Sequence, residues 1–530
     1  METFHAIKDA EAPLITRAMQ NSHAIPADLR ALDVGAPTAH TTPLFDTAAA
    51  RHLLNRAGFG GTQAQVDALV AMGLDHAVDL LVNFETQPSK TVNSDDFDRD
   101  LMPPLNREER TALNAARASR EEAEVERLER KENQAKANDR RQLVDLKKWW
   151  IARMIESARP LEEKMTLFWH GHFATGARTI EDSWHMFQQN QLFRTYATGN
   201  FGMLVLNVIR DPAMIKYLDN DKSRKGRPNE NLARELLELF ILGEGSGYTE
   251  DDIKAGARAL TGYTFEDDDF DYRDGNHDAG PKTIFGKEGN WTGDEFARLA
   301  LAKTACSEFI ASKLYRYFVN DTPAADLRAE QRDAREAFIR ALATELRTQQ
   351  YEIKPVLAKL FRSAHFHHAS NRAATIKSPA QLIVQTIRQY GTPPRQLSAL
   401  AGACDLMGQD LFQPPNVKGW DGGRAWINTS TLFVRQNVAI YLLTGKRPDV
   451  YDWENDETRF DPIPLLGGAT TPDAVTDRLI SISLAAPPHP ERRAALVSFL
   501  TSQTHMEASE HSRTIAALAL VTALPEYQLA

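Results

Sequence analysis

Apolar residues recur three and four positions apart along most of the chain, and this spacing predicts helices. The pattern is clearest from Leu146 to Phe173, where tryptophan, methionine, leucine and phenylalanine return at helical intervals. Further helices are expected at residues 180–197, 229–242, 250–261, 294–319, 327–346, 353–363 and 376–390. Runs of β-branched residues that alternate with polar ones are nearly absent. We therefore expect an all-α protein, a large multi-helix globular fold.

One expected helical segment has almost no apolar face. Residues 107–146 are dense in Arg, Glu, Lys and Ala, with acids and bases interleaved and few large apolar residues. Ion pairs between neighbouring turns stabilise such a segment in water. We expect a protruding charged arm, either one long helix or a helical hairpin.

Turn and cap residues predict where helices start and where the helical pattern stops. Thr62 follows the glycine-rich break at 58–61 and is expected to cap the next helix. Thr249, with Asp252 three residues later, has the pattern of a capping box. Two long polar segments, at 263–293 and 411–428, interrupt the helical pattern and are expected to be functional loops.

The length of the chain predicts more than one subdomain. At 530 residues it exceeds the size at which a single core keeps growing. We divide it into an extended N-terminal arm at 1–43, a helical core at 44–445 that contains the charged arm, and a C-terminal helical region at 446–530.

Composition and charge narrow the class of protein. The hydrophobic fraction of 42% and the charged fraction of 25% are typical of a soluble globular chain. A net charge of −10 argues against a nucleic-acid partner, and no apolar run is long enough to span a membrane. The two cysteines, Cys306 and Cys404, are expected to be buried thiols. Without a secretory signal pattern, we expect a cytoplasmic protein, or one that reaches the periplasm by co-export with a partner.

The segment Leu167–Phe173 contains a histidine pair that could bind a metal ion. Gly171, and the Ala-Thr-Gly that follows Phe173, predict that the helix ends near His170. In an extended or turn conformation, the imidazoles of His170 and His172 could then face one side, as metal ligation requires. The alternative is that one histidine caps the helix C-terminus and the other is hydrogen-bonded in the core.

Two other groups of histidines have the same ambiguity. Glu181, Asp182 and His185 lie close together in sequence, and the spacing of Glu181 and His185 suits either a shared ligand face or a local ion pair near a helix start. Three later histidines could form a weak surface metal patch or lie in a solvated loop: His365, His367 and His368.

The segment Asn229–Phe240 has one apolar and one polar stripe. The apolar stripe consists of Leu232, Leu236, Leu239 and Phe240, and the polar stripe of Asn231, Arg234, Glu235 and Glu238. This is typical of a surface helix with its charges in water. The alternative is a buried network in which Arg234 orients the carboxylates.

Each of the two predicted loops carries candidate functional side chains. In the first, His277 could be a general base or a further metal ligand, next to Asp278 and Lys282. In the second, two tryptophans beside an arginine could stack on a sugar ring or simply plug the loop against the core: Trp420, Arg424 and Trp426.

Six motifs follow one another along the chain. They are His52-Leu-Leu-Asn-Arg-Ala-Gly-Phe-Gly60, Met165–Phe173, Asn229–Gly243, Tyr248–Ile253 with Ala259–Gly262, His277–Lys282, and Pro414–Trp420. Together they resemble a large bacterial family known as domain of unknown function 1800, over roughly residues 45 to 440. The resemblance implies a mostly helical bacterial protein and singles out the polar motif positions His170, His172, Glu230, Arg234, Glu235, Glu238, His277, Asp278 and Lys282.

The resemblance also implies a partner. Genes of this family look commonly paired with those of a second family, domain of unknown function 1501, whose members resemble alkaline-phosphatase-like enzymes. A phosphatase-like protein is therefore an expected partner of this chain.

The leading functional hypothesis is a hydrolase-like enzyme that depends on a divalent metal ion. The metal ligands would be His170, His172 and Glu235, with Glu238 or His277 as the base, Arg234 as a clamp for the transition state, and Asp278 and Lys282 beside them. One alternative is a non-enzymatic helical scaffold or co-export partner. Another is a carbohydrate-binding protein that uses Trp420, Arg424 and Trp426.

Overall fold

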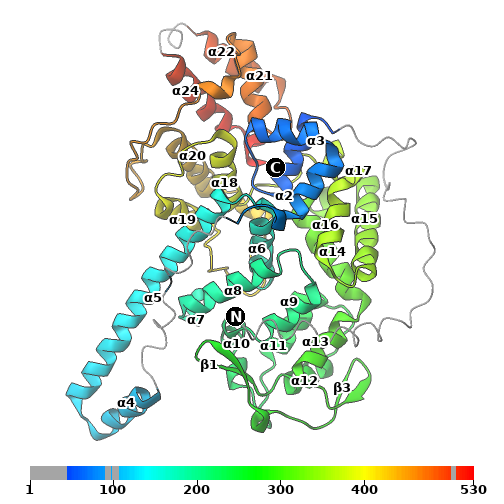
Figure 1. Ribbon diagram of the computed structural model, residues 1–530, viewed down its shortest axis with the longest axis vertical. Coiled ribbons are helices and arrows are strands. Elements are labelled where there is room, and N and C mark those ends of the chain that lie inside the picture. The colour runs from blue at the N-terminus through cyan, green and yellow to red at the C-terminus, as the bar shows by residue number, and fades with distance from the viewer. Residues whose placement is uncertain (1–44, 90–96, 98–106, 503–508) are drawn as a thin grey trace. The chain divides into compact units, whose positions relative to one another are not determined.

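The computed structural model of the protein describes residues 45–89, 97, 107–502 and 509–530 (Figure 1). Over these residues the chain is mostly helical with two small antiparallel sheets, so the expected all-α class is confirmed. The chain divides into two compact units. Unit 1 holds Gly199–Lys313 and Glu330–Val356, and unit 2 holds Leu314–Ala329, Leu357–Ala530 and the described residues before Gly199. The N-terminal arm expected at 1–43 lies outside the described residues, and the predicted domain division stays a prediction.

Unit 2 is a helical assembly in which α5 packs against α18 and both helices contact α19. Helix α5 packs against α6, α8, α18 and α19, and α18 packs against α19 and α20 as well. Near the C-terminus, α21, α22 and α24 pack against one another. The helices of this unit are α2 (Thr47–Ala57), α3 (Gln63–Val82), α4 (Arg107–Ser119), α5 (Glu122–Glu156), α6 (Pro160–His172), α7 (Ala177–Ile180), α8 (Ser183–Thr195), α17 (Ala364–His367), α18 (Pro379–Tyr390), α19 (Leu397–Leu406), α20 (Thr429–Thr444), α21 (Pro472–Ser483), α22 (Pro490–Thr501) and α24 (Glu510–Ala523).

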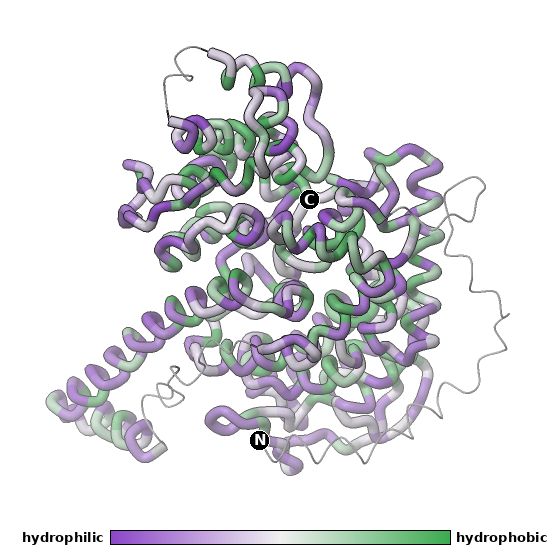
Figure 2. Tube along the Cα trace, turned by 45° about the horizontal axis from the view of Figure 1, so that its top comes forward, coloured by the Kyte–Doolittle hydropathy of each residue, from purple (hydrophilic) through white to green (hydrophobic). Residues whose placement is uncertain are grey.

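The charged arm expected at 107–146 is a helical hairpin made by α4 and the first part of α5. Figure 2 shows that hydrophilic residues dominate it. The chain turns at Arg120, which has a positive φ of 59°. Leu113 and Leu128 form a small apolar contact between the two helices, and ion pairs such as Arg117–Glu129, at 2.9 Å, lie beside it. The predicted form is confirmed, although α5 continues to Glu156 and joins the core of unit 2.

Both predicted helix starts are confirmed in atomic detail. Thr62 accepts a hydrogen bond from the backbone N–H of Gln65, whose side chain reaches back to the backbone of Thr62. Thr249 and Asp252 make the same reciprocal pair at the start of α12 (Glu250–Ala259). Each capping box satisfies two backbone donors that the first turn of a helix leaves open.

A buried carboxylate joins three elements in the core of unit 2. Glu163 of α6 is fully buried and accepts hydrogen bonds from Arg153 Nε at 2.8 Å, Arg194 Nε at 2.9 Å and Arg194 Nη2 at 3.0 Å. The indole Nε1 of Trp150 donates a fourth, at 3.0 Å. Burial alone raises the pKa of Glu163, but the charges and hydrogen bonds of Arg194 and Arg153 outweigh it, so the pKa lies below its ordinary value.

Helix α18 carries a chain of buried glutamines one turn apart. Gln381 Nε2 donates to Gln385 Oε1 at 2.8 Å, and Gln385 Nε2 donates to Gln389 Oε1 at 3.1 Å. Lys164 Nζ donates to Gln381 Oε1 at one end, and Gln389 Nε2 donates to the carbonyl of Ile482 at the other. All the polar groups in this series of hydrogen bonds are buried, and each glutamine amide donates to the next residue in the series.

Unit 1 combines short helices with two β-hairpins. Its helices include α9 (Phe201–Val208), α10 (Pro212–Tyr217), α11 (Asn231–Glu235), α12, α13 (Gly293–Leu301) and most of α15 (Ala329–Thr348). The strands are β1 (Tyr263–Glu266), β2 (Asp269–Tyr272), β3 (Lys282–Ile284) and β4 (Lys287–Gly289). Strand β1 pairs with β2 and β3 with β4, both antiparallel, and α12 contacts β3. Besides α15, whose first residue belongs to unit 2, the helices α14 (Thr304–Phe318) and α16 (Ile353–Arg362) run across a boundary between the units.

Two expectations for unit 1 need correction. The helix predicted at 229–242 begins at Asn231 and continues as a π-helical turn, η5 (Leu236–Ile241), so Leu237 is buried where the α-helical pattern placed Leu239. The segment 263–293, predicted to be a loop, contains both hairpins. Strands of three or four residues are too short to show an alternating pattern, which is why the sequence concealed them.

Candidate functional site

His170 is a neutral histidine in the core of unit 2. It is buried on α6, where its Nε2 accepts a hydrogen bond from the backbone N–H of Phe412 at 3.1 Å. The rings of Trp150, Phe412 and Trp420 surround it, with centroids 5.2–5.5 Å from the centroid of His170. Burial lowers the pKa of His170 to about 3. The Nε2 lone pair of His170 is therefore occupied by this hydrogen bond, as expected for a histidine that is hydrogen-bonded in the core.

His172 lies on the same helix, which continues past the predicted end. Helix α6 runs to His172 rather than stopping near His170. Residues two apart on a helix point in different directions, so the extended geometry assumed for a shared metal ion is wrong. The ring of His172 contacts Phe173, with centroids 4.5 Å apart, and Trp169, with centroids 5.7 Å apart.

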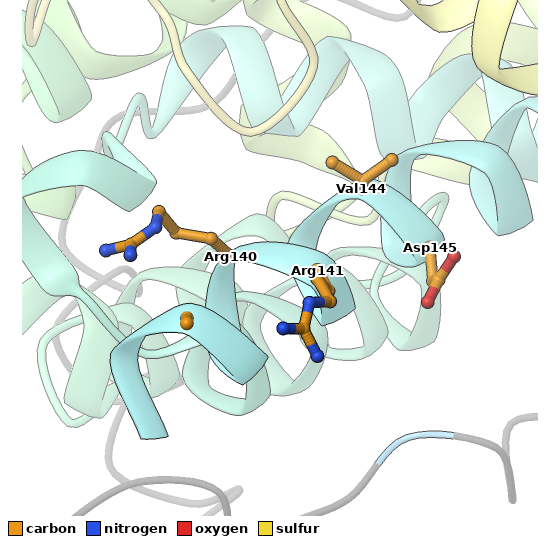
Figure 3. Close-up of a pocket in the computed structure, with 5 residues that line it drawn as sticks. Arg140, Arg141, Val144 and Asp145 are labelled. Carbon is orange, nitrogen blue, oxygen red and sulfur yellow. The ribbon is translucent and has the colours of Figure 1, made fainter. Parts of the chain in front are cut away.

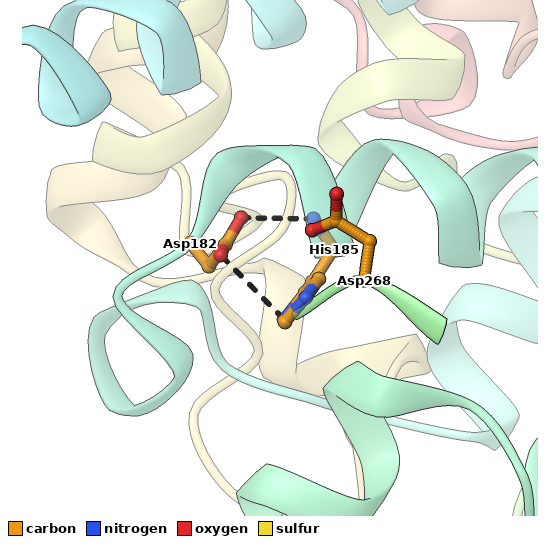
Figure 4. A group of neighbouring side chains, drawn as sticks. All are labelled: Asp182, His185 and Asp268. Atoms are coloured by element: carbon orange, nitrogen blue, oxygen red, sulfur yellow. Dashed lines mark hydrogen bonds and ion pairs between the residues drawn. The ribbon is translucent and has the colours of Figure 1, made fainter. Parts of the chain in front are cut away.

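A histidine–carboxylate pair lies at the start of α8 (Figure 4). Asp182 caps the helix, because its Oδ1 accepts hydrogen bonds from the backbone N–H groups of Trp184 at 3.0 Å and His185 at 3.1 Å. The other oxygen, Oδ2, lies 3.7 Å from His185 Nδ1. Both side chains are buried. The carboxylate facing His185 is thus Asp182, whereas the spacing had also suggested Glu181, which is exposed.

Helix α5 fixes this helix start from the other side. Asp139 Oδ1 accepts the backbone N–H of Ser183 at 2.6 Å, and Gln142 Nε2 donates to the hydroxyl of Ser183 at 3.1 Å. Asp139 and Gln142 are both buried. The backbone N–H groups of Ser183, Trp184 and His185 are therefore all held by buried carboxylates, those of Asp139 and Asp182.

In unit 1, Arg234 is surrounded by carboxylates. Its guanidinium donates to Glu230 at 3.1 Å, to Glu238 at 3.4 Å and to Glu250 at 2.8 and 2.9 Å. Arg234 and Glu238 are half-buried, as is Glu235. The arrangement combines the two alternatives drawn from the sequence: Arg234 orients carboxylates, but at the surface. Three acidic neighbours reduce its attraction for an incoming anion.

The motifs Ala259–Gly262 and His277–Lys282 are joined by hydrogen bonds. Thr261 accepts, through its carbonyl, a hydrogen bond from His277 Nδ1 at 2.9 Å, and through its hydroxyl one from the backbone N–H of Asp278 at 2.8 Å. Gly262 has a φ of +84°, and a Cβ there would lie 2.8 Å from the carbonyl oxygen of Arg273. Because its Nδ1 donates to a carbonyl, His277 presents Nε2 as the basic nitrogen.

Asp278 forms a two-point ion pair that the sequence did not predict. Arg258 donates to it through Nε at 2.7 Å and through Nη2 at 3.2 Å. The hydrogen bond from Arg258 is the main reason why the pKa of Asp278 falls to about 2. Lys282 is buried nearby and donates to the carbonyl of Gly280 at 3.1 Å, and burial lowers its pKa. Arg258 directly precedes a motif, and only its distance from Asp278 in sequence concealed the pair.

The second predicted loop uses its tryptophans mainly for packing. Trp426 is buried, and its carbonyl accepts a hydrogen bond from the hydroxyl of Thr431 at 2.9 Å. Trp420 is half-buried against His170, with ring centroids 5.5 Å apart. Arg424 is exposed and pairs with Asp326 at 2.9 Å. These positions match the alternative in which the loop closes over the core.

A shallow groove lies along the exposed side of α5 (Figure 3). It is lined by Ala137, Arg140, Arg141, Val144 and Asp145. Val144 is 46% exposed, which is high for a large apolar side chain. The groove thus joins an apolar centre to two guanidinium groups.

Two of the comparisons with known proteins give no match, and one identifies the family. No curated protein and no solved structure matches the chain. None of the helices in the described part of the chain is long and apolar enough to cross a membrane. A family model described as "Protein of unknown function (DUF1800)" matches residues 52–529. Since this match covers nearly the whole chain, the protein belongs to the DUF1800 family.

Proposed function

We propose that this protein is a metal-dependent enzyme of the hydrolase type and that Asp182 and His185 bind its ion. One observation carries the proposal: a buried carboxylate oxygen and a buried imidazole nitrogen face each other at 3.7 Å. That distance is longer than a hydrogen bond. Two ligands of a tetrahedral ion, with bonds of about 2.0–2.2 Å, lie about 3.3–3.6 Å apart.

The surroundings of the pair support this role. The oxygen of Asp182 that caps α8 fixes the carboxylate, so its second oxygen is oriented before an ion arrives. Hydrogen bonds to a ligating carboxylate are typical of metal sites. One imidazole and one carboxylate leave coordination positions for water and substrate, and a bound ion would make that water acidic enough to ionise near neutral pH.

Unit 1 holds two candidates for proton transfer, which are proposed independently of the ion site in unit 2. We retain His277 as the first candidate for a general base, because the hydrogen bond to Thr261 fixes its tautomer. Glu238 is the second, since it is half-buried beside Arg234. Asp278 is held ionised by Arg258 and is better described as a residue that positions the loop.

The test is the metal content of the purified protein, measured by plasma mass spectrometry after removal of loosely bound ions. We expect close to one equivalent of zinc or another divalent transition metal. The variants Asp182→Asn and His185→Gln should lose it, whereas Glu181→Gln, an exposed neighbour, should keep it. Asparagine is a good helix cap, so Asp182→Asn tests the ligand without removing the cap. A wild-type protein without metal, or variants with unchanged metal content, would refute the proposal.

The groove on α5 favours a second function, binding of a protein partner. Its apolar centre at Val144 and its flanking Arg140 and Arg141 suit an apolar segment with acidic residues. We propose the phosphatase-like protein of the family domain of unknown function 1501 as that partner. Co-purification should be lost in Arg140→Glu/Arg141→Glu and kept in Arg127→Glu/Arg130→Glu, a change of equal charge on the same helix outside the groove. Equal recovery of the partner with both variants would argue against the groove.

A further inference from the structure

Two buried histidines from distant parts of the sequence meet in unit 2. His52 lies on α2, within the first family motif, and His367 is the last residue of α17. Their side chains are 3% and 4% exposed, and the ring centroids lie 6.1 Å apart. Phe366 packs on His52 with centroids 4.5 Å apart, and Phe45 packs edge-on against His367 at 5.9 Å. The pair is therefore enclosed by aromatic rings.

The hydrogen bonds of the two rings fix the same tautomer in both. His52 Nε2 lies 3.1 Å from the carbonyl oxygen of Phe366, and His367 Nε2 lies 2.9 Å from that of Phe361. A carbonyl only accepts, so each Nε2 carries the proton and each Nδ1 carries a lone pair. Neither Nδ1 has a hydrogen-bond partner within the part of the chain that the structure describes. Buried lone pairs of this kind are rare without a ligand.

We propose that His52 and His367 bind one soft monovalent transition-metal ion, Cu⁺, through their Nδ1 atoms. A ligating histidine almost always donates its other ring N–H to a carbonyl or carboxylate, which is the arrangement of both rings here. Two nitrogens on one ion lie at most about 4 Å apart. With the ring centroids 6.1 Å apart, two nitrogens that face each other from the ring edges come within this limit.

The charges and ligand types around the pair favour a monovalent ion. Among the described residues, no third His, Cys, Asp or Glu completes a three-ligand cluster with the two histidines. Burial lowers the pKa of His52, and the charges of Arg56 and Arg372 lower it further. Burial also lowers the pKa of His367, to about 4, while the charge of Asp46 acts in the opposite direction. Two neutral nitrogens bring no negative charge to offset a divalent ion in a buried site, whereas d¹⁰ Cu⁺ accepts two neutral nitrogen ligands in a line.

The experiment is an anaerobic titration of the full-length protein with Cu⁺ against a chromogenic chelator. We expect one tightly bound equivalent in the wild type. His52→Gln and His367→Gln should each weaken binding at least tenfold. His368→Gln, a change of the exposed neighbouring histidine, should leave binding unchanged. His185→Gln should also retain Cu⁺, so failure at this site is distinguishable from failure of the metal centre at α8.

A measurement on the wild type avoids any effect of the variants on folding. X-ray absorption at the copper edge should show two nitrogen scatterers in a linear arrangement and no sulfur. A sulfur scatterer, the absence of a stoichiometric Cu⁺ ion, or wild-type affinity in both His52→Gln and His367→Gln would each overturn the proposal.

Discussion

Replacement of the buried Glu163 by glutamine tests how much the core of unit 2 depends on one charge. In the native protein each carboxylate oxygen accepts two hydrogen bonds, Oε1 from Arg153 and Arg194, and Oε2 from Arg194 and Trp150. An amide keeps the shape but presents an NH₂ group to two of these donors. Loss of one partner of a buried ion pair costs about 3–5 kcal/mol, and each buried donor left without an acceptor accounts for about 1–3 kcal/mol of such a cost. We expect Glu163→Gln to lower the free energy of unfolding by about 3–5 kcal/mol.

The adjacent Glu162→Gln is the matched control. Burial and the nearby charge of Glu163 raise the pKa of Glu162, so its ionised form is less favourable in the folded protein than in the unfolded chain. Removing that charge should leave stability unchanged or raise it slightly. Urea unfolding, followed by tryptophan fluorescence at pH 7, measures both variants. A cost below about 1 kcal/mol for Glu163→Gln, or equal costs for both, would refute the reasoning.

The two remaining predictions concern the loop that carries His277. Arg258→Gln should raise the pKa of Asp278 from about 2 toward its ordinary value. Because the native pKa is lowered, this pair stabilises the fold above about pH 4 and loses that contribution as the pH falls toward 2; we expect the variant to lose about 1 kcal/mol at pH 7, since the pair is partly exposed. Gly262→Ala should cost about 1–3 kcal/mol, because its φ of +84° and the carbonyl of Arg273 at 2.8 Å exclude a Cβ. Hydrogen exchange at His277 should increase in Gly262→Ala, and native protection there would contradict the expected strain.

Local rules predicted the parts of the fold that depend on neighbours in sequence. Thr62 and Thr249 were recognisable as helix caps because a capping box needs only residues three positions apart. The charged hairpin was recognisable because its composition excludes a buried face on most of its length. The turn to π-helix at Leu236 was not, since the choice between two helical ladders depends on what the helix packs against.

The candidate site shows the same limit. Sequence spacing brought Asp182 and His185 into consideration but could not decide which acid faces the ring, because that depends on the helix start at Ser183. The pairing of Arg258 with Asp278 spans 20 residues, and no periodicity encodes it. His170 was chosen for its chemistry, yet its environment of aromatic rings and one backbone N–H became visible only with the fold.

The glutamine chain on α18 has a consequence for the register of that helix. Its donors all point one way, from Lys164 Nζ to the carbonyl of Ile482, so reversing one amide would place donor against donor and acceptor against acceptor. If α18 slipped by one turn, the two hydrogen bonds between its own glutamines would remain, but Gln381 would lose Lys164 and Gln389 would lose the carbonyl of Ile482. Apolar packing tolerates such slips at modest cost, whereas buried polar groups do not. The series of glutamines therefore fixes the position of α18 along its own axis, because both of its ends keep their partners only at that position.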